Sequence, residues 1–216
     1  MTSFSTSREF LISDEQTLRG LFPATHALAA LKSQNFLDAH AQAFIGRAPF
    51  LCLGTQSAAG KADVSPRGDP AGFVKILDSQ TLAIPDRPGN NRLDSLVNLI
   101  ANPSVGLLFI IPGYDDTLRV NGQASVVTDP ELLESMRVND RLPRVAIVVR
   151  VSEVFLHCAK AFRRSHLWDP AHFQDRAQMP SLMKILLDQT TGAPSDAEAM
   201  RKMDEGLEAD YKTSMY

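Results

Sequence analysis

Two arginines flank a turn that leads into a predicted helix. Residues 84–94 read IPDRPGNNRLD, which places Arg87 and Arg92 on either side of a Pro-Gly-Asn-Asn turn. Unpaired amide groups at the start of a helix favour negative charge, and a guanidinium group matches phosphate oxygens two at a time. The segment therefore indicates an anion site with a phosphate as its guest. The alternative is that the asparagines cap the helix and the arginines are solvated.

A third arginine lies in the sequence SPRGD at residues 65–69. A proline and a glycine bracket Arg67 between two predicted strands, so its side chain is expected to be held at a bend. From there it can reach the same anion. The alternative is an ion pair with Asp63 or Asp69, without a ligand.

The sequence TLRVNG at residues 117–122 places Arg119 and Asn121 two positions apart on a predicted strand. Residues two apart on a strand point to the same face. Polar side chains on one face of an apolar strand suit a flat heteroaromatic ring with carbonyl and ring-nitrogen acceptors. An ordinary solvent-facing strand would show the same alternation.

A basic and aromatic segment follows the last predicted strand. Residues 157–168 contain Lys160, Arg163, Arg164 and the single tryptophan, Trp168. This combination can contact a phosphate or stack on a ring. The alternative is a charged helix surface.

The histidines and cysteines predict no metal site. His157, His166 and His172 lack a tight ligand motif, and neither Cys52 nor Cys158 belongs to a C-x-x-C pair. Both cysteines lie in apolar, strand-like surroundings, where they are expected to be small buried hydrophobic residues.

The composition limits the classes of partner. A formal net charge of −3 over 216 residues gives no sequence-wide reason to expect nucleic acid or an anionic membrane. Neither a secretory signal nor an apolar run long enough to cross a bilayer is present, so we expect a cytoplasmic protein.

The candidate site residues must be positioned by secondary structure, and the pattern of apolar residues predicts about seven strands with few helices. Short apolar or alternating runs predict strands at residues 50–55, 62–65, 73–77, 81–84, 105–111, 118–127 and 145–156. Helical spacing predicts helices at residues 36–45, 91–101 and 129–137, the second with Leu93, Leu96, Val97 and Ile100 on one apolar face. Strands joined by short turns, without a helix after each, favour an antiparallel barrel over a Rossmann sheet.

Capping patterns predict helices towards both ends of the chain. The sequence SDEQ at residues 13–16 predicts one helix, and SDAE at residues 195–198 predicts another in an acidic tail. We therefore expect an N-terminal helical segment (1–48), a β domain (49–170) and a C-terminal helical extension (171–216), all in one compact unit.

The order of these segments resembles a known family. The succession of SPRGD, DRPGNNR before a helix, Asn102-Pro103, LRVNG on a strand and a late HCxKAxxRSxxW is similar to the pyridoxamine 5'-phosphate oxidase-like FMN-binding proteins, in the branch of unassigned substrate. The resemblance covers residues 36–168. It implies a mainly β, α+β fold with flanking helices, built on a six-stranded antiparallel split β-barrel, in a homodimer that holds FMN at the subunit interface.

The resemblance also implies roles for individual residues. Ser65 belongs to the cofactor-binding set, and the phosphate end of FMN would be held by Arg67, Arg87, Asn91 and Arg92. Arg119 and Asn121 would lie along the flavin or its ribityl chain. A late segment, expected from the neighbouring subunit, would supply Lys160, Arg163, Ser165 and Trp168.

The family relationship predicts an FMN-dependent oxidoreductase that acts on an unidentified small molecule. The oxidase itself ends in a strand with an arginine and a histidine that grip its substrate, whereas this chain ends in an acidic helix, so pyridoxamine phosphate is not the expected substrate. Two alternatives remain: a flavin-binding or storage protein without turnover, and a split-barrel protein that uses deazaflavin or haem.

Overall fold

The computed structural model describes residues 10–216. They divide into two compact units, one before Gln34 and one from Gln34 to Tyr216. The first unit holds helices α1 (Glu15–Gly20) and α2 (Ala27–Leu31), in which no residue is buried. Asp14 caps α1, one residue after the serine of the predicted capping pattern. Within residues 10–216, no helix combines the length and the apolar character needed to cross a membrane.

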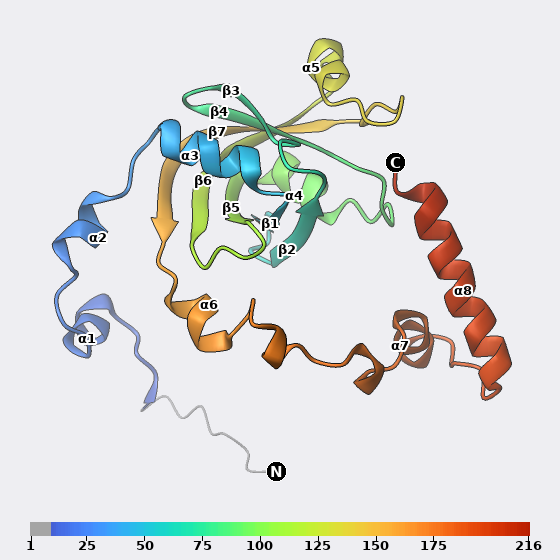
Figure 1. Cartoon of the computed structure of the whole chain (residues 1–216). Coiled ribbons are helices and arrows are strands. Elements are labelled where there is room, and N and C mark those ends of the chain that lie inside the picture. Colours follow the sequence, from blue (N-terminus) through green and yellow to red (C-terminus); the bar gives the residue numbers. More distant parts are fainter. Residues whose placement is uncertain (1–9) are drawn as a thin grey trace. The chain divides into compact units, whose positions relative to one another are not determined.

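The second unit is built on one antiparallel sheet of seven strands, in the order β2-β1-β5-β6-β7-β4-β3 (Figure 1). Each strand overlaps a run that the sequence pattern predicts. The strands are β1 (Phe50–Gln56), β2 (Ala62–Gly68), β3 (Lys75–Asp78), β4 (Thr81–Pro85), β5 (Ser104–Ile110), β6 (Thr117–Val127) and β7 (Ala146–His157). The predicted fold class, mainly antiparallel β with flanking helices, is confirmed.

The six-stranded barrel implied by the family resemblance is wrong for this chain. The β3–β4 hairpin joins the sheet along β7, with Leu82 opposite Val149, and so brings the number of strands to seven. Among the described residues, β2 and β3 are the two edges of an open sheet. The expected bend at residues 65–68 is also wrong, because these residues continue β2, with Pro66 opposite Cys52. An edge strand accepts a proline because one side of it has no pairing partner.

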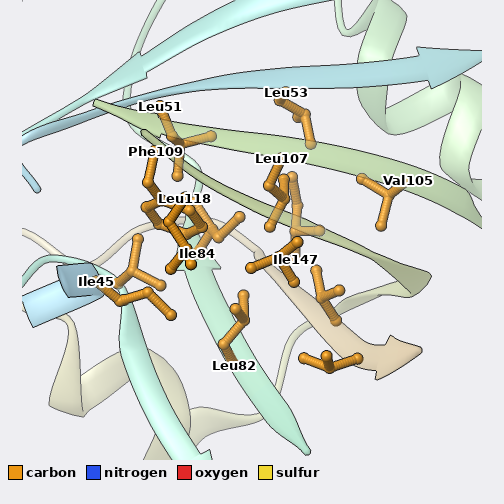
Figure 2. Packing of buried hydrophobic residues seen from close by; sticks show 14 of the residues in the cluster. Ile45, Leu51, Leu53, Leu82, Ile84, Val105, Leu107, Phe109, Leu118 and Ile147 are labelled. Carbon is orange, nitrogen blue, oxygen red and sulfur yellow. The ribbon is translucent and has the colours of Figure 1, made fainter. Parts of the chain in front are cut away.

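The core lies on one side of the strands, as the two-residue period requires. In β1 the buried residues alternate with partly buried ones, and Leu51 and Leu53 are fully buried. Figure 2 shows their side chains together with those of Leu107 and Phe109 from β5 and Ile84 from β4. Burying each such side chain stabilises the fold by roughly 1.5–3 kcal/mol.

Three helices of this unit precede β1 or connect strands, and three come after β7 in the chain. Helix α3 precedes β1 and buries Ala41 and Ile45, and Figure 2 shows Ile45 beside the strand side chains. Helix α5 begins after Asp129, which caps it, and buries Leu133. The helices of this unit are α3 (Ala39–Arg47), α4 (Asp94–Ala101), α5 (Pro130–Ser135), α6 (Lys160–Ser165), α7 (Leu182–Gln189) and α8 (Ala197–Ser214), with short 3₁₀ turns η2 (Pro170–His172) and η3 (Arg176–Gln178).

Helix α4 buries only Leu96 of the apolar face that the sequence predicts. Its buried residues are Ser95, Leu96 and Leu99, whereas Leu93, Val97 and Ile100 are 50, 58 and 77% exposed. The helix begins three residues later than the pattern indicates, at Asp94. On the buried side Leu96 and Leu99 pack into the core and Ser95 makes hydrogen bonds to the sheet, described below, which leaves an apolar strip on the surface.

Gly122 lies at an irregularity in the pairing of β6 with β7. A Cβ atom built there would lie 2.1 Å from the carbonyl oxygen of Arg150 and 3.1 Å from the Val149 side chain. Only a glycine lets the two backbones approach this closely. The bulge shifts the register directly after Asn121, so it sets how the polar residues of β6 face those of β7.

We expect Gly122→Ala to lower the free energy of unfolding by about 3 kcal/mol or more, because the added methyl group must displace the β7 backbone. Urea denaturation of the purified chain measures this change. The control is Gly46→Ala in α3, where nothing lies within 4 Å of the new Cβ atom. That change should be neutral or stabilising by up to about 1 kcal/mol, since alanine favours a helix. Equal stability of the two variants would contradict the prediction.

Candidate functional site

Arg67 and Arg87 come together with two aspartates beside the end of β4. Arg67 Nη1 lies 2.5 Å from Asp86 Oδ1, and Arg87 Nε lies 2.6 Å from Asp69 Oδ2. The Arg87 and Asp69 side chains are 15 and 1% exposed, and those of Arg67 and Asp86 are 18 and 19% exposed. Arg67 therefore pairs with neither Asp63 nor Asp69, the two partners considered from the sequence. Arg87 is not solvated, which was the alternative for that residue.

Tyr216 covers this group of charges. Its hydroxyl donates to Asp69 Oδ1 over 2.5 Å, and its ring centroid lies 5.8 Å from Arg87 Cζ. Arg141 donates to the Tyr216 carbonyl oxygen. The hydrogen bond to Asp69, burial and the charge of Asp69 together raise the pKa of Tyr216. Sequence reasoning missed this residue, because no local signal connects positions 147 residues apart.

A hydrogen-bond network fixes α4 to the edge of the sheet. Asp63 on β2 accepts from Ser95 Oγ at 2.7 Å and from Thr55 Oγ1 at 3.1 Å. Ser65 Oγ lies 3.0 Å from Ser95 Oγ, and Asn98 donates to Thr55 Oγ1 over 3.0 Å. Ser95 and Thr55 are 4 and 6% exposed, so these bonds have little competition from water. The network connects β1 and β2 to the first turn of α4.

The loop that enters α4 has an unusual backbone. Asn91 and Leu93 have φ of 56 and 61°, in the left-handed region. This region is uncommon for asparagine and costly for a leucine. Leu93 occupies the N-cap position of α4, and no side chain caps the helix there. By contrast, aspartate or serine side chains cap α3, α5, α7 and α8.

Arg92 lies directly before this helix start and is exposed. Arg92 Nε lies 2.8 Å from Asp94 Oδ2, with side chains 71 and 48% exposed. The hydrogen bond and the charge of Asp94 raise the pKa of Arg92, so the guanidinium group stays charged. Asn90 Oδ1 accepts from the Arg92 backbone amide at 3.1 Å. The asparagine therefore shapes the loop and does not cap the helix.

Arg119 and Asn121 share one face of β6, as the sequence predicts. Asn121 Nδ2 donates to Glu153 Oε2 over 2.7 Å, and Arg119 Nη2 lies 3.5 Å from the same oxygen. Arg119 Cζ lies 4.6 Å from the centroid of the Phe155 ring. Among the described residues, Arg119 Nε is the one buried side-chain polar atom without a hydrogen-bond partner. An unpaired buried donor of this kind is unfavourable until an acceptor reaches it.

An open groove of about 460 Å³ lies along the same face of the sheet. Gly54 on β1 pairs with Gly106 on β5, and Gly106 pairs with Asn121 on β6. Because both paired residues are glycines, no side chain fills the space above β1 and β5 at this point. The groove is lined by Gly54, Thr55, Gln56, Ser104, Val105, Gly106, Asn121, Gly122, Gln123 and Ser152.

The late basic segment makes its own contacts. Arg163 Nε lies 3.0 Å from Asp115 Oδ2, Trp168 Nε1 donates to the Tyr114 carbonyl oxygen over 2.8 Å, and Ser165 Oγ donates within α6. Lys160 begins α6. Within residues 10–216, no hydrogen bond or ion pair of Arg163, Ser165 or Trp168 reaches the cluster of Arg67 and Arg87.

The structure thus joins some of the predicted site residues and separates others. Arg67 Nε donates to Ser65 Oγ over 3.4 Å and pairs with Asp86, and Asp86 is the chain neighbour of Arg87, which pairs with Asp69. Asn91 and Arg92 lie on the loop that leads into α4. The remaining predicted residues form two other groups, on β6 (Arg119, Asn121) and around α6 (Lys160, Arg163, Ser165, Trp168).

Residues 37–158 match the family model of pyridoxamine 5'-phosphate oxidase. The matched range contains the whole sheet and the loop into α4, and it covers more than half of the 216 residues. The chain belongs to this family. Ser65, Arg67, Arg87, Asn91, Arg92, Arg119 and Asn121 lie inside the range, and the predicted residues around α6 lie beyond it.

Several solved structures resemble this member of the pyridoxamine 5'-phosphate oxidase family. HupZ of Group A Streptococcus is 16% identical over 55% of this chain and 92% of its own, with a TM-score of 0.45. An F420 reductase is 23% identical over 52% and 94%, with a TM-score of 0.39. An FMN-binding protein from Syntrophomonas wolfei is 10% identical over 66% and 96%, with a TM-score of 0.41. These likenesses are too distant to say anything about activity, and no curated protein matches the chain.

We expect Asp69→Asn to lower the free energy of unfolding by about 3–5 kcal/mol, because it leaves the poorly exposed Arg87 guanidinium without its carboxylate. Asp94→Asn is the matched control, since it breaks an ion pair of the same type in a solvated position. That variant should lose about 1 kcal/mol or less. Urea denaturation monitored by circular dichroism compares the two. A loss for Asp69→Asn no larger than that for Asp94→Asn would show that the Arg87 pair contributes no more than a surface pair.

Proposed function

We propose that this member of the pyridoxamine 5'-phosphate oxidase family binds FMN and acts as an oxidoreductase on an unidentified small molecule. The observation that carries the proposal is the uncapped N-terminus of α4, preceded by Arg92 and by Asn91, whose backbone lies in the left-handed region. Exposed amide groups at a helix start, beside an arginine, form an arrangement that binds a phosphate. The phosphate of FMN would take the place of the missing cap.

Charge balance indicates which arginine contacts the phosphate. Arg67 and Arg87 are each held by a poorly exposed aspartate, so their charges are largely neutralised where they stand. The Arg92–Asp94 pair is solvated, and such pairs contribute about 1 kcal/mol or less, so Arg92 can exchange its partner at little cost. We therefore assign the phosphate contacts to Arg92, Asn91 and the first turn of α4. Arg67 and Arg87 support the loop, and Ser65 holds the helix.

The rest of the cofactor would lie along the sheet. The glycine pair of β1 and β5 leaves a groove beside Asn121, and Arg119 has a buried N–H group that lacks an acceptor. A flavin offers ring carbonyl and nitrogen acceptors and a ribityl chain of hydroxyls for these donors. When bound, FMN supplies hydride or electron-pair transfer, and the side chains bind and orient it.

A second copy of the chain completes the proposed site. The predicted residues Lys160, Arg163, Ser165 and Trp168 make contacts apart from the arginine cluster, as expected if they serve the site of a neighbouring subunit. Leu93, Val97 and Ile100 form an exposed apolar strip on α4, whose first turn belongs to the site. Exposed apolar patches of this kind mark protein–protein interfaces.

We expect Arg92→Ala to weaken FMN binding by about 10–100-fold, the effect of losing a charge-assisted hydrogen bond to the phosphate. Riboflavin, which lacks the phosphate, should bind wild type and variant equally. Quenching of flavin fluorescence on titration measures both affinities. Arg137→Ala is the matched control, because Arg137, like Arg92, is an exposed arginine paired with a nearby carboxylate, that of Glu134. Unchanged FMN affinity in Arg92→Ala would remove this residue from the site.

Turnover is tested separately from binding. The FMN-loaded protein is mixed with NADH or NADPH and an acceptor such as oxygen, and absorbance reports the consumption of the nicotinamide. Saturable consumption supports an oxidoreductase. Tight FMN binding with neither nicotinamide nor oxygen reacting favours a flavin carrier, and preferential binding of a deazaflavin cofactor over FMN would replace the cofactor in the proposal.

We expect the double change Val97→Glu and Ile100→Glu to convert a dimer into a monomer, because charges would be buried at the interface. Sedimentation velocity should show twice 23.7 kDa for the wild type and 23.7 kDa for the variant. Leu142→Glu is the control, since Leu142 is an exposed apolar residue outside α4. A monomeric wild type would exclude the shared site.

A further inference from the structure

The turn after α6 brings three potential metal ligands together. His166 ends the helix in the left-handed region, with φ of 52° and ψ of 34°. The Asp169 amide then donates to the His166 carbonyl oxygen over 3.0 Å, and the His172 amide to that of Asp169 over 2.9 Å. These two successive turns, each closed by a hydrogen bond between residues three positions apart, place His166, Asp169 and His172 on the same side of the chain.

The side chains of these residues converge. The imidazole rings of His166 and His172 are stacked, with centroids 4.2 Å apart and planes 9° apart. Asp169 Oδ2 lies 3.1 Å from His172 Nδ1. One potential ligand atom from each residue lies within 4.8 Å of the other two. Sequence spacing did not reveal this set, because H-x-x-D-x-x-H matches no regular helical ligand motif.

We propose that His166, Asp169 and His172 bind a divalent transition-metal ion of the zinc type. Two imidazoles and one carboxylate are ligands that Zn²⁺, Ni²⁺ and Cu²⁺ accept, whereas Mg²⁺ and Ca²⁺ prefer oxygen ligands alone. Water would complete the coordination of the ion. The metal would take the place of the hydrogen bond between His172 and Asp169.

The geometry needs only a small adjustment. Ligand atoms around a tetrahedral zinc ion lie roughly 3.3 Å apart. All three side chains are exposed, so they can move closer by changing rotamers without disturbing a packed core. The left-handed backbone of His166 also supports the proposal. Glycine is the usual residue at a left-handed helix end, and a histidine there has a conformational cost that metal binding would offset.

Zinc titration of the untagged, chelator-treated full chain tests the proposal by calorimetry. We expect one Zn²⁺ per chain. His166→Gly and His172→Ala should each weaken zinc binding by at least about tenfold. Changing a residue that only supports a metal ligand already has an effect of this size, and these two residues are ligands themselves. His40→Ala, which changes an exposed histidine outside the cluster, should have no effect. Trp168 lies between His166 and Asp169 in the chain, so saturable quenching of its fluorescence by Cu²⁺ gives an independent readout.

His166→Gly also separates loss of a ligand from loss of fold. Glycine relieves the left-handed backbone, so the variant should have a melting temperature equal to or above that of the wild type while binding zinc weakly. Absence of saturable zinc binding to the wild type, or wild-type affinity in His166→Gly, would overturn the inference. The site does not depend on the proposed flavin function, and a chain that binds zinc without FMN would leave it standing.

Discussion

The position of α4 depends on the partly buried carboxylate of Asp63. This group accepts hydrogen bonds from Ser95 on the helix and from Thr55 on β1, while β2 itself carries Asp63 and Ser65. A carboxylate that is partly removed from water is stabilised by donors, so the favoured docking of the helix presents Ser95 to Asp63 while Leu96 and Leu99 pack into the core. In that orientation Val97 and Ile100 stay exposed, and the first turn of α4 lies beside the arginine-bearing edge of the sheet.

Electrostatic balance then limits what the arginine cluster can bind. Arg67 and Arg87 are matched by Asp86 and Asp69, and Tyr216 adds a hydrogen bond to Asp69. A cluster neutralised in this way stabilises the loop more than it attracts an anion. The attraction must come from groups that are still available, namely the solvated Arg92 and the uncapped amides of α4. A sequence rich in arginine at one place is therefore not equivalent to a positive pocket.

The polar residues on the sheet and those around α6 lie in different kinds of backbone. Arg119 and Asn121 lie on a regular strand, and the bulge at Gly122 fixes how they face β7. Residues around α6 lie in short turns stabilised by local hydrogen bonds, and it is there that His166 and His172 stack. A rigid sheet suits orientation of a planar ligand, whereas exposed turns suit a small ion that draws flexible side chains together.

Period and turn chemistry in the sequence alone determined the seven strands, the antiparallel class and the common face of Arg119 and Asn121, because these are local consequences of alternation along the chain. Motif order also indicated the family. The tertiary structure decided the partners: Asp86 for Arg67, Ser95 for Asp63, Tyr216 for Asp69. These pairings join residues 19 to 147 positions apart, and burial selects them by requiring each polar group to find a partner, a condition that no local pattern encodes.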